Sequence, residues 1–337
     1  MSRIATRPSA LQANENAAVL ATSLRKDGIH YLDQKRWARI ARDWDIALDA
    51  DGVFKKDHKL LDECRRMAFR VFGSDVGYKH GFKYTINDAI GAKLGTIHGY
   101  NTGPEPMQAI VAVNRLTAEE NPTFMGISFA RLSAAQAFRK ILSNENAAVI
   151  LDGLRAKYLD DSDKARTAEM FHFYHVDPGL YKHPSMARFM VEVPGSTRAV
   201  MDIHEHCATT GKQLSIYTDT PNRATLLRHF EAVGFEAGMI DRLNETVLMV
   251  TQADVKHRKP HPEGLSKIKR DKGLLYGGDT GRDGLAVHNT RAALETDEIE
   301  FAGVLSGGSR VDVLMEHRPV VVANDIGAIA RLLRETA

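Results

Sequence analysis

Short apolar runs alternate with amphipathic segments along much of this chain, and this alternation constrains the fold more than any other feature. Runs of strand type cover residues 46–49, 213–218, 246–250 and 274–278. Segments of helical period cover residues 198–211, 222–234 and 262–273. Alternation of strands and helices predicts a parallel sheet with right-handed crossovers. We therefore expect an α/β fold with a doubly wound, Rossmann-like core.

The first of these strands is separated from the others by a long stretch of different character. Within it, residues 105–121, 127–144 and 145–174 have the apolar spacing of successive helices. The core is thus predicted to consist of a short first piece and a long C-terminal piece, with a mainly helical insertion between them.

Composition excludes several classes of protein. The 337 residues carry 45 basic and 43 acidic side chains, and a net charge of +2 gives no reason to expect a nucleic acid or membrane partner. No apolar run has the length of a membrane span, and the N-terminus lacks the apolar block of a secretory signal. Cys64 and Cys207 have neither disulfide nor zinc spacing. These features favour a reducing compartment, and we predict a cytoplasmic protein.

Polar residues with catalytic potential follow three of the predicted strands. Asp49 and Asp51 end the first strand, Thr218 ends the second, and Asp279 follows the last, with Asp283 one helical turn further on. The carboxyl ends of parallel strands share one rim of a sheet, where open α/β sheets bind ligands. Paired carboxylates at such a rim can hold a divalent cation and supply a nucleophile and a proton donor.

With Lys259 in the segment KPHP, these residues occur in the order of four sequence motifs, namely DADG, YT, KP and GGDTGRD. In this order the chain resembles the haloacid dehalogenase superfamily of aspartate-nucleophile phosphohydrolases, over residues 44–335. The resemblance implies a helical cap domain inserted between the first two motifs. We accordingly expect an N-terminal extension over 1–43 that ends in a short helix, a catalytic core over 44–54 and 205–337, and a cap over 55–204.

The resemblance also implies a role for each carboxylate. Asp49 is the expected nucleophile, and Asp51 is the expected general acid and base. Mg²⁺ is the expected cofactor, because hard oxygen ligands suit a small cation. Its expected ligands are Asp49, the backbone carbonyl of Asp51 and Asp279. Asp283 is expected either to bind the cation through water or to orient Lys259.

The phosphoryl group is expected to be bound by three residues. Thr218 would donate to it through its hydroxyl and its main-chain N–H, Lys259 would supply positive charge, and Gly52 lies in the first turn beside it. Lys256 and Arg258 compete with Lys259 for the motif position. Asp219 and Thr220 are interpreted as turn residues.

The predicted function is a Mg²⁺-dependent phosphohydrolase that acts on a small phosphorylated metabolite through an aspartyl-phosphate. The acidic residue at position 51 favours phosphoryl chemistry over carbon–halogen chemistry. Two alternatives remain open: a sugar phosphomutase of the same fold, and a scaffold that has lost catalysis and acts as a binding protein. The substrate and the oligomeric state are not predicted.

Several other signals are interpreted as structural. Residues 204–207 have the sequence HEHC, but residues two apart on a helix point to different faces, so zinc binding is not expected there. His172, His175 and His183 are likewise not assigned to a metal site. The basic side chains Lys79, His80 and Lys83 are interpreted as solvated surface. Although the glycines of GGDTGRDG resemble a dinucleotide fingerprint, their acidic residue argues against a pyrophosphate there.

Overall fold

Contacts along the chain divide this computed structural model into two units, which are described separately. Unit 1 comprises Met1–Asp57 and Met190–Ala337, and unit 2 comprises His58–Phe189. The structure describes residues 28–56, 105–176, 191–307, 309 and 311–336. Within these ranges no helix is both long enough and apolar enough to cross a bilayer.

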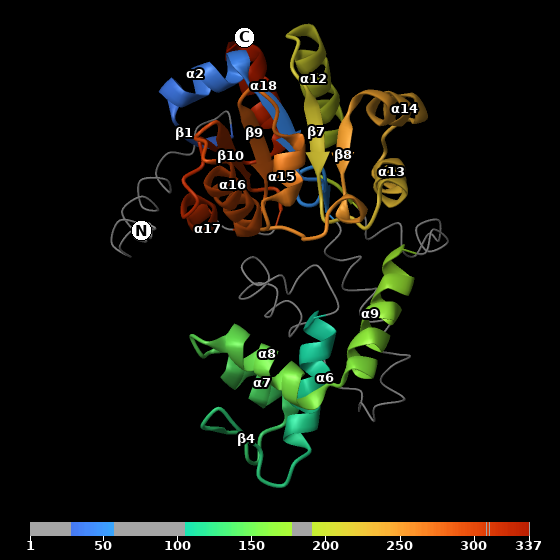
Figure 1. Ribbon diagram of the computed structural model, residues 1–337, viewed down its shortest axis with the longest axis vertical. Coiled ribbons are helices and arrows are strands. Elements are labelled where there is room, and N and C mark those ends of the chain that lie inside the picture. The colour runs from blue at the N-terminus through green and yellow to red at the C-terminus, as the bar shows by residue number, and fades with distance from the viewer. Residues whose placement is uncertain (1–27, 57–104, 177–190, 308, 310, 337) are drawn as a thin grey trace. The chain divides into compact units, whose positions relative to one another are not determined.

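Unit 1 is built on one seven-stranded sheet with the strand order β1-β11-β10-β9-β2-β7-β8 (Figure 1). Every pairing in it is parallel except that of the edge strand β1 with β11. The sheet order confirms the predicted doubly wound core. The strands span Ile29–Leu32 (β1), Asp45–Leu48 (β2), Leu214–Tyr217 (β7), Leu248–Val250 (β8), Leu274–Gly278 (β9), Ile299–Val304 (β10) and Val321–Ala323 (β11).

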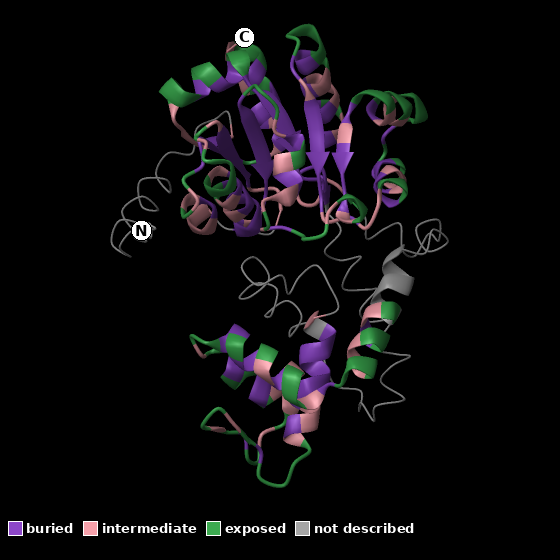
Figure 2. Cartoon of the chain, in the orientation of Figure 1, coloured by how far each residue is buried: buried purple, intermediate pink, exposed green. Residues whose placement is uncertain are grey.

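Helices cover both faces of this sheet, so its central strands are almost entirely buried (Figures 1 and 2). Contacts join α12 to α18 and α18 to α2 on one side, and α15, α16 and α17 to their neighbours on the other. The first set spans Ser196–Thr209 (α12), Ile326–Thr336 (α18) and Gln34–Asp43 (α2). The second set spans Glu263–Ile268 (α15), Gly281–Leu294 (α16) and Val311–Met315 (α17). Burial on both faces explains why these strands are continuous apolar runs rather than alternating ones.

The connection from β7 to β8 contains two helices where the sequence predicted one. Helix α13 spans Arg223–Ala232, within the predicted range, and α14 follows it at Ala237–Thr246. Only Leu243 of α14 is buried. Helix α14 therefore adds only one side chain to the core, and the sequence analysis assigned no element to it.

Of the residues before the first motif, the described stretch 28–43 adds an edge strand and a helix to the sheet. Helix α2 was predicted, whereas the edge strand β1 was not. Trp37, Ile40 and Ala41 form the buried stripe of α2, and Asp33 caps its first turn by accepting from the Arg36 N–H. This short strand was missed because its burial depends on β11, which is almost the whole chain away.

The position of strand β2 explains where a ligand site can form. Its partners are β9 on one side and β7 on the other, and the chain reaches them by crossovers in opposite directions. Such a reversal of strand order leaves a crevice outside the carboxyl ends of the strands. The ends of β2, β7 and β9 carry Asp49, Thr218 and Asp279, respectively.

Two short strands mark the place where the chain leaves unit 1 and returns to it. Strand β3, Lys55–Lys56, pairs antiparallel with β6, Val191–Glu192. Ser196 strengthens this junction, because its hydroxyl donates to the carbonyl of Phe54 at 2.8 Å. The division at residues 57 and 190 assigns α12 to unit 1, whereas the predicted cap extended to residue 204.

The described part of unit 2 is mainly helical, with its own apolar core. Helices α6, α7, α8 and α9 span Glu105–Thr117, Ala134–Leu142, Ala147–Tyr158 and Asp161–Val176. Around Phe138 and Leu151, apolar side chains of the first three helices form a buried cluster. The predicted helix over 127–144 is shorter in the structure, because a hairpin of β4 (Thr123–Phe124) and β5 (Ile127–Ser128) precedes the capping box of Ser133 and Gln136.

The predicted helix over 145–174 is divided into α8 and α9 at residues 159 and 160. Asp160 starts the second helix there by accepting from the Asp163 N–H at 2.7 Å. Cys64, the basic residues at positions 79, 80 and 83, and His183 lie outside the described residues, as do the side chains of His172 and His175.

Candidate active site

A buried ion pair between the first and third motifs lies at the carboxyl end of β2. The Lys259 ammonium is 2.9 Å from Asp49 Oδ1, and both residues are buried. Asp49 is oriented by two further bonds, since its N–H donates to the Gly277 carbonyl at 2.7 Å and its Oδ1 accepts from the Ala50 N–H at 2.8 Å. Lys256 and Arg258, the competing basic residues, are exposed. The structure therefore brings Lys259, and neither of its basic neighbours, to Asp49.

A second carboxylate holds the same ammonium. Asp283 Oδ1 is 2.9 Å from Lys259 Nζ, and Asp283 Oδ2 accepts from the N–H and hydroxyl of Thr280 at 3.0 and 2.6 Å. Thr280 and Asp283 form the capping box of α16. The first turn of α16 therefore holds the Asp283 carboxylate in place, and Asp283 in turn holds the Lys259 ammonium.

The predicted metal ligands come together at the same place. Asp49, Asp279 and Asp283 are all buried, and they offer carboxylate oxygens that lie within 4.8 Å of one another. Hard oxygen donors at this spacing fit a small divalent cation. A Cβ atom at Gly52 or at Gly307 would overlap the Asp279 carboxylate, so both glycines make room for it. The donor set and this cradle fit Mg²⁺.

Asp51 lies beside Thr218, but its carboxylate also has a partner that the sequence did not predict. The Thr218 hydroxyl donates to Asp51 Oδ2 at 3.2 Å, and the fully buried Lys55 forms an ion pair with Asp51 Oδ1. Lys55 reaches Asp51 because Gly52, at φ 70°, turns the chain and donates its N–H to the Lys55 carbonyl at 2.7 Å. Lys55 lies four residues after Asp51. The sequence alone does not show that the turn between them brings the two charges together.

One predicted interaction of Thr218 is wrong. Its main-chain N–H donates to the Val250 carbonyl at 3.1 Å, as part of the ladder between β7 and β8, and is not directed at a ligand. The hydroxyl is held by the Thr220 N–H, which donates to it at 3.2 Å, and lies 3.0 Å from the Thr220 hydroxyl. Thr220 therefore does more than form a turn.

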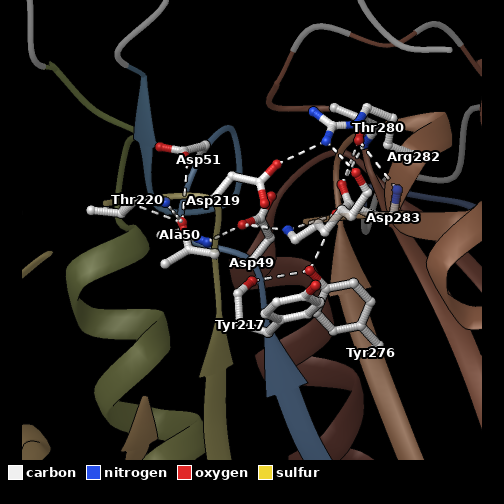
Figure 3. A network of polar contacts seen from close by, with 12 residues as sticks. Asp49, Ala50, Asp51, Tyr217, Asp219, Thr220, Tyr276, Thr280, Arg282 and Asp283 are labelled. Carbon is white, nitrogen blue, oxygen red and sulfur yellow. Dashed lines mark hydrogen bonds and ion pairs between the residues drawn. The ribbon is translucent and has the colours of Figure 1, made fainter. Parts of the chain in front are cut away.

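An ion pair that the sequence analysis missed joins the second and fourth motifs. Asp219 Oδ2 is 3.0 Å from Arg282 Nη2, and both residues are largely buried (Figure 3). The same Arg282 nitrogen donates to the carbonyl of Lys259. Asp219 was interpreted as a turn residue because nothing in its local sequence indicates a cation more than 60 residues away.

Burial and charge act in opposite directions on the ionisable groups of this site. Burial raises the pKa of Asp49 well above its usual value; Lys259 opposes the shift, and nearby carboxylates add to it. Burial disfavours ionisation of Asp283 too, but Lys259 and Thr280 outweigh it and lower the pKa of Asp283. For Lys259, burial disfavours the charge, yet Asp283 and Asp49 raise its pKa above the usual value. The lysine is therefore charged, and the carboxylates around it repel one another.

The other possible metal-binding group in the described part of the chain is a weaker candidate than the aspartate cluster. Besides the aspartate cluster, only His257, His261 and Glu263 bring three possible ligands together in the regions described. The Glu263 carboxylate, however, accepts from the N–H groups of Lys256 and His257, and these bonds lower its pKa to about 2. It holds the loop that leads to Lys259. Among the described residues, neither group includes any residue of HEHC.

Comparisons with known proteins agree with this fold. No protein-family model and no curated protein sequence matches the chain. Among solved structures it is similar to a candidate phosphoglycolate phosphatase from Lactobacillus delbrueckii subsp. bulgaricus, with 17% identity, a TM-score of 0.52, and coverage of 87% of this chain and 98% of that one. A phosphatase from Thermococcus thioreducens has 15% identity and a TM-score of 0.51, with coverage of 87% and 99%. A hydrolase from Pseudomonas syringae has 15% identity and a TM-score of 0.50, with the same coverage. At these identities the likeness is one of fold.

Proposed function

We propose that this chain is a Mg²⁺-dependent phosphohydrolase of the haloacid dehalogenase type, which removes phosphate from a small phosphorylated metabolite through an aspartyl-phosphate. One observation carries the proposal. A buried carboxylate, Asp49, contacts a buried ammonium, Lys259, and shares a donor set of divalent-cation type with Asp279 and Asp283. The phosphatases and the hydrolase of similar fold support the choice of reaction.

The chemistry follows from how these groups would share charge. An Asp49 oxygen attacks phosphorus, and the bond from phosphorus to the substrate oxygen breaks. The Lys259 ammonium and the Thr218 hydroxyl stabilise the phosphoryl oxygens. A bound Mg²⁺, held by Asp49, Asp279 and the Asp51 carbonyl, with Asp283 beside it, would neutralise phosphoryl charge and lessen the repulsion among the carboxylates. Water then attacks the phosphoenzyme and releases phosphate.

Asp51 is the proposed proton carrier for both halves of the reaction. It gives its proton to the departing oxygen and takes one from the attacking water. Its carboxylate accepts from the Thr218 hydroxyl and forms an ion pair with Lys55, so proton transfer requires this pair to loosen. Gly52 is retained as a phosphate neighbour, although its N–H donates within the turn. We further propose that unit 2 serves as the cap and carries the side chains that select the substrate.

Hydrolysis of p-nitrophenyl phosphate tests the proposal. The wild-type protein is expected to release p-nitrophenol only with Mg²⁺, and Asp49→Asn is expected to abolish the release because an amide is a poor nucleophile. Asp43→Asn is the matched control: Asp43 lies at the exposed end of α2 and pairs with Arg42, so this change is expected to leave the rate unaltered. Activity that survives Asp49→Asn would remove the proposed nucleophile.

The same protein distinguishes hydrolysis from phosphoryl migration. Incubation with a panel of sugar phosphates, phosphoglycolate, nucleotides and amino-acid phosphates is expected to yield free phosphate. Mass spectrometry of acid-quenched protein should locate the phosphoryl group on Asp49. An isomerised sugar phosphate without free phosphate would indicate a mutase, and no turnover of any ester would indicate a scaffold that has lost catalysis.

A further inference from the structure

The Lys259 ammonium lies over two aromatic rings that no part of the proposed reaction uses. Its Nζ is 5.0 Å from the ring centroid of Tyr217 and 5.4 Å from that of Tyr276. Both tyrosines are fully buried, with ring centroids 6.0 Å apart (Figure 3). A cation at this distance from an aromatic face is attracted by the ring electrons, more so where water is excluded.

The two hydroxyl groups differ in their surroundings. Tyr276 Oη is 3.1 Å from Asp283 Oδ1 and 3.1 Å from the Tyr217 carbonyl. It has one proton to donate, and the charged carboxylate is the stronger acceptor. The buried Tyr217 hydroxyl has no hydrogen-bond partner among the described residues. Both tyrosine rings therefore contact the same ammonium. Among the described residues, the Tyr276 hydroxyl has hydrogen-bond partners and the Tyr217 hydroxyl has none.

The bond from Tyr276 completes the coordination of Asp283. The Asp283 carboxylate accepts from four donors: the Thr280 N–H and hydroxyl on Oδ2, and Lys259 Nζ and Tyr276 Oη on Oδ1. A carboxylate has about four lone-pair sites, and four protein donors already point at this one. Its oxygens cannot move without breaking a bond, and Lys259 is held between this immobile carboxylate and Asp49.

We propose that Tyr276 is a positioning residue for phosphoryl transfer: its hydroxyl locks Asp283, and Asp283 keeps the Lys259 ammonium against Asp49. The inference rests on the proposed function, because it concerns the lysine that faces the phosphoryl group. Electrostatic stabilisation of a transition state depends on charges that are placed before the reaction starts. A lysine that moves between several positions binds the substrate nearly as well but stabilises the transition state less.

Tyr276→Phe tests the inference, because it removes one oxygen atom and keeps the ring. Tyr217→Phe makes the same chemical change at the hydroxyl without a partner. We expect kcat to fall about tenfold in Tyr276→Phe, the effect of one hydrogen bond to a charged group, with KM changed less than about twofold. The loss in Tyr276→Phe is expected to exceed the loss in Tyr217→Phe by at least about fivefold. Equal losses in the two variants would overturn the inference.

A double-mutant cycle identifies the path of the effect. If the hydroxyl acts through Asp283, Tyr276→Phe should have almost no further effect on kcat in an Asp283→Asn background. Additive losses would overturn the proposed path. Urea unfolding of each variant gives the folded fraction under assay conditions, and a loss of kcat that only follows this fraction would also overturn the inference.

The proposed function and the positioning inference fail in different ways. A wild-type protein without activity on any phosphate ester would reject both. Activity that requires Asp49 but is insensitive to the Tyr276 hydroxyl would reject the positioning role alone.

Discussion

At the scale of single residues, two glycines make room for one carboxylate of this site. Gly52 and Gly307 come from opposite ends of the chain and face the Asp279 carboxylate, where a Cβ atom on either would overlap it. Ser306 ties the two segments together, because its hydroxyl donates to the Gly52 carbonyl at 2.6 Å. The space for the Asp279 carboxylate, a proposed metal ligand, is therefore left by the missing side chains of Gly52 and Gly307.

Gly307→Ala is expected to weaken Mg²⁺ binding. Gly307 does not have a positive φ, so the added methyl group acts by displacing Asp279 rather than by straining the backbone. We expect the Mg²⁺ concentration for half-maximal activity to rise about tenfold, equivalent to about 1.4 kcal/mol of lost binding free energy. A Mg²⁺ titration of phosphatase activity, or calorimetry, measures the shift.

Gly238→Ala provides the matched control. Gly238 lies in α14, where an added methyl group meets no atom within 4 Å. It should leave the Mg²⁺ requirement unaltered and stabilise the protein by up to about 1 kcal/mol through helix propensity. The same Mg²⁺ requirement in both alanine variants would contradict the cradle.

At the scale of elements, the site depends on how the loop after β7 is joined to the first turn of α16. The Asp219–Arg282 ion pair makes this connection over the backbone of Lys259. The two charges balance each other beside the place proposed for a phosphoryl dianion. Removing either one should therefore change substrate binding in a direction set by the charge that remains.

Asp219→Asn and Arg282→Met are expected to change KM in opposite directions. The first leaves an additional positive charge near the phosphoryl group and should lower KM several-fold; the second leaves a negative charge and should raise it several-fold. Steady-state kinetics at low and high salt measure both effects, which should be smaller at high salt. Shifts of the same sign would indicate that the pair acts only on structure.

The end of α12 provides a pH-sensitive contact between elements. Lys212 Nζ is 3.0 Å from Nε2 of the buried His206 and also donates to the Ala41 carbonyl of α2. Burial, together with the charge of Lys212, lowers the pKa of His206. The unfolded chain therefore takes up the imidazole proton more readily than the folded one.

The resulting prediction is a loss of stability in mild acid. The contribution of His206 is fully present above its unfolded pKa of about 6.5 and decreases as the pH falls toward its lower folded pKa. His206→Gln, which keeps an acceptor for Lys212 but binds no proton, should unfold with a weaker dependence on pH between about 7.5 and 5.5. Urea unfolding across this range measures it, and parallel curves for the two proteins would contradict it.

At the scale of the whole molecule, the described part of each unit has an apolar core of its own. Phe138 is fully buried in the cluster of unit 2, and Phe301 is buried in a cluster beneath the sheet of unit 1. Because each unit buries its own apolar residues, we expect the units to unfold in distinguishable transitions.

Phe138→Ala and Phe301→Ala should each affect a different transition. Truncating a buried phenylalanine costs about 3–5 kcal/mol. In differential scanning calorimetry, Phe138→Ala should lower the temperature of the unit 2 transition. Phe301→Ala should lower the temperature of the unit 1 transition. A single transition that both variants shift together would mean that the units unfold as one.

The amino-acid sequence by itself determined the class of fold and most of the candidate site. Strand and helix periods, and the polar residues that follow the strands, are local properties, and they were enough to predict the doubly wound sheet and to bring Asp49, Asp279 and Asp283 to one rim. Lys259 follows no predicted strand and was assigned from the resemblance of its segment KPHP to a family motif. Only the tertiary structure decided the pairings: Lys55 with Asp51, Arg282 with Asp219, Tyr276 with Asp283, and β1 with β11. It also decided that the Thr218 N–H belongs to the sheet. A sequence period specifies which way a side chain faces, whereas its partner depends on the path of loops and on neighbours that are distant along the chain.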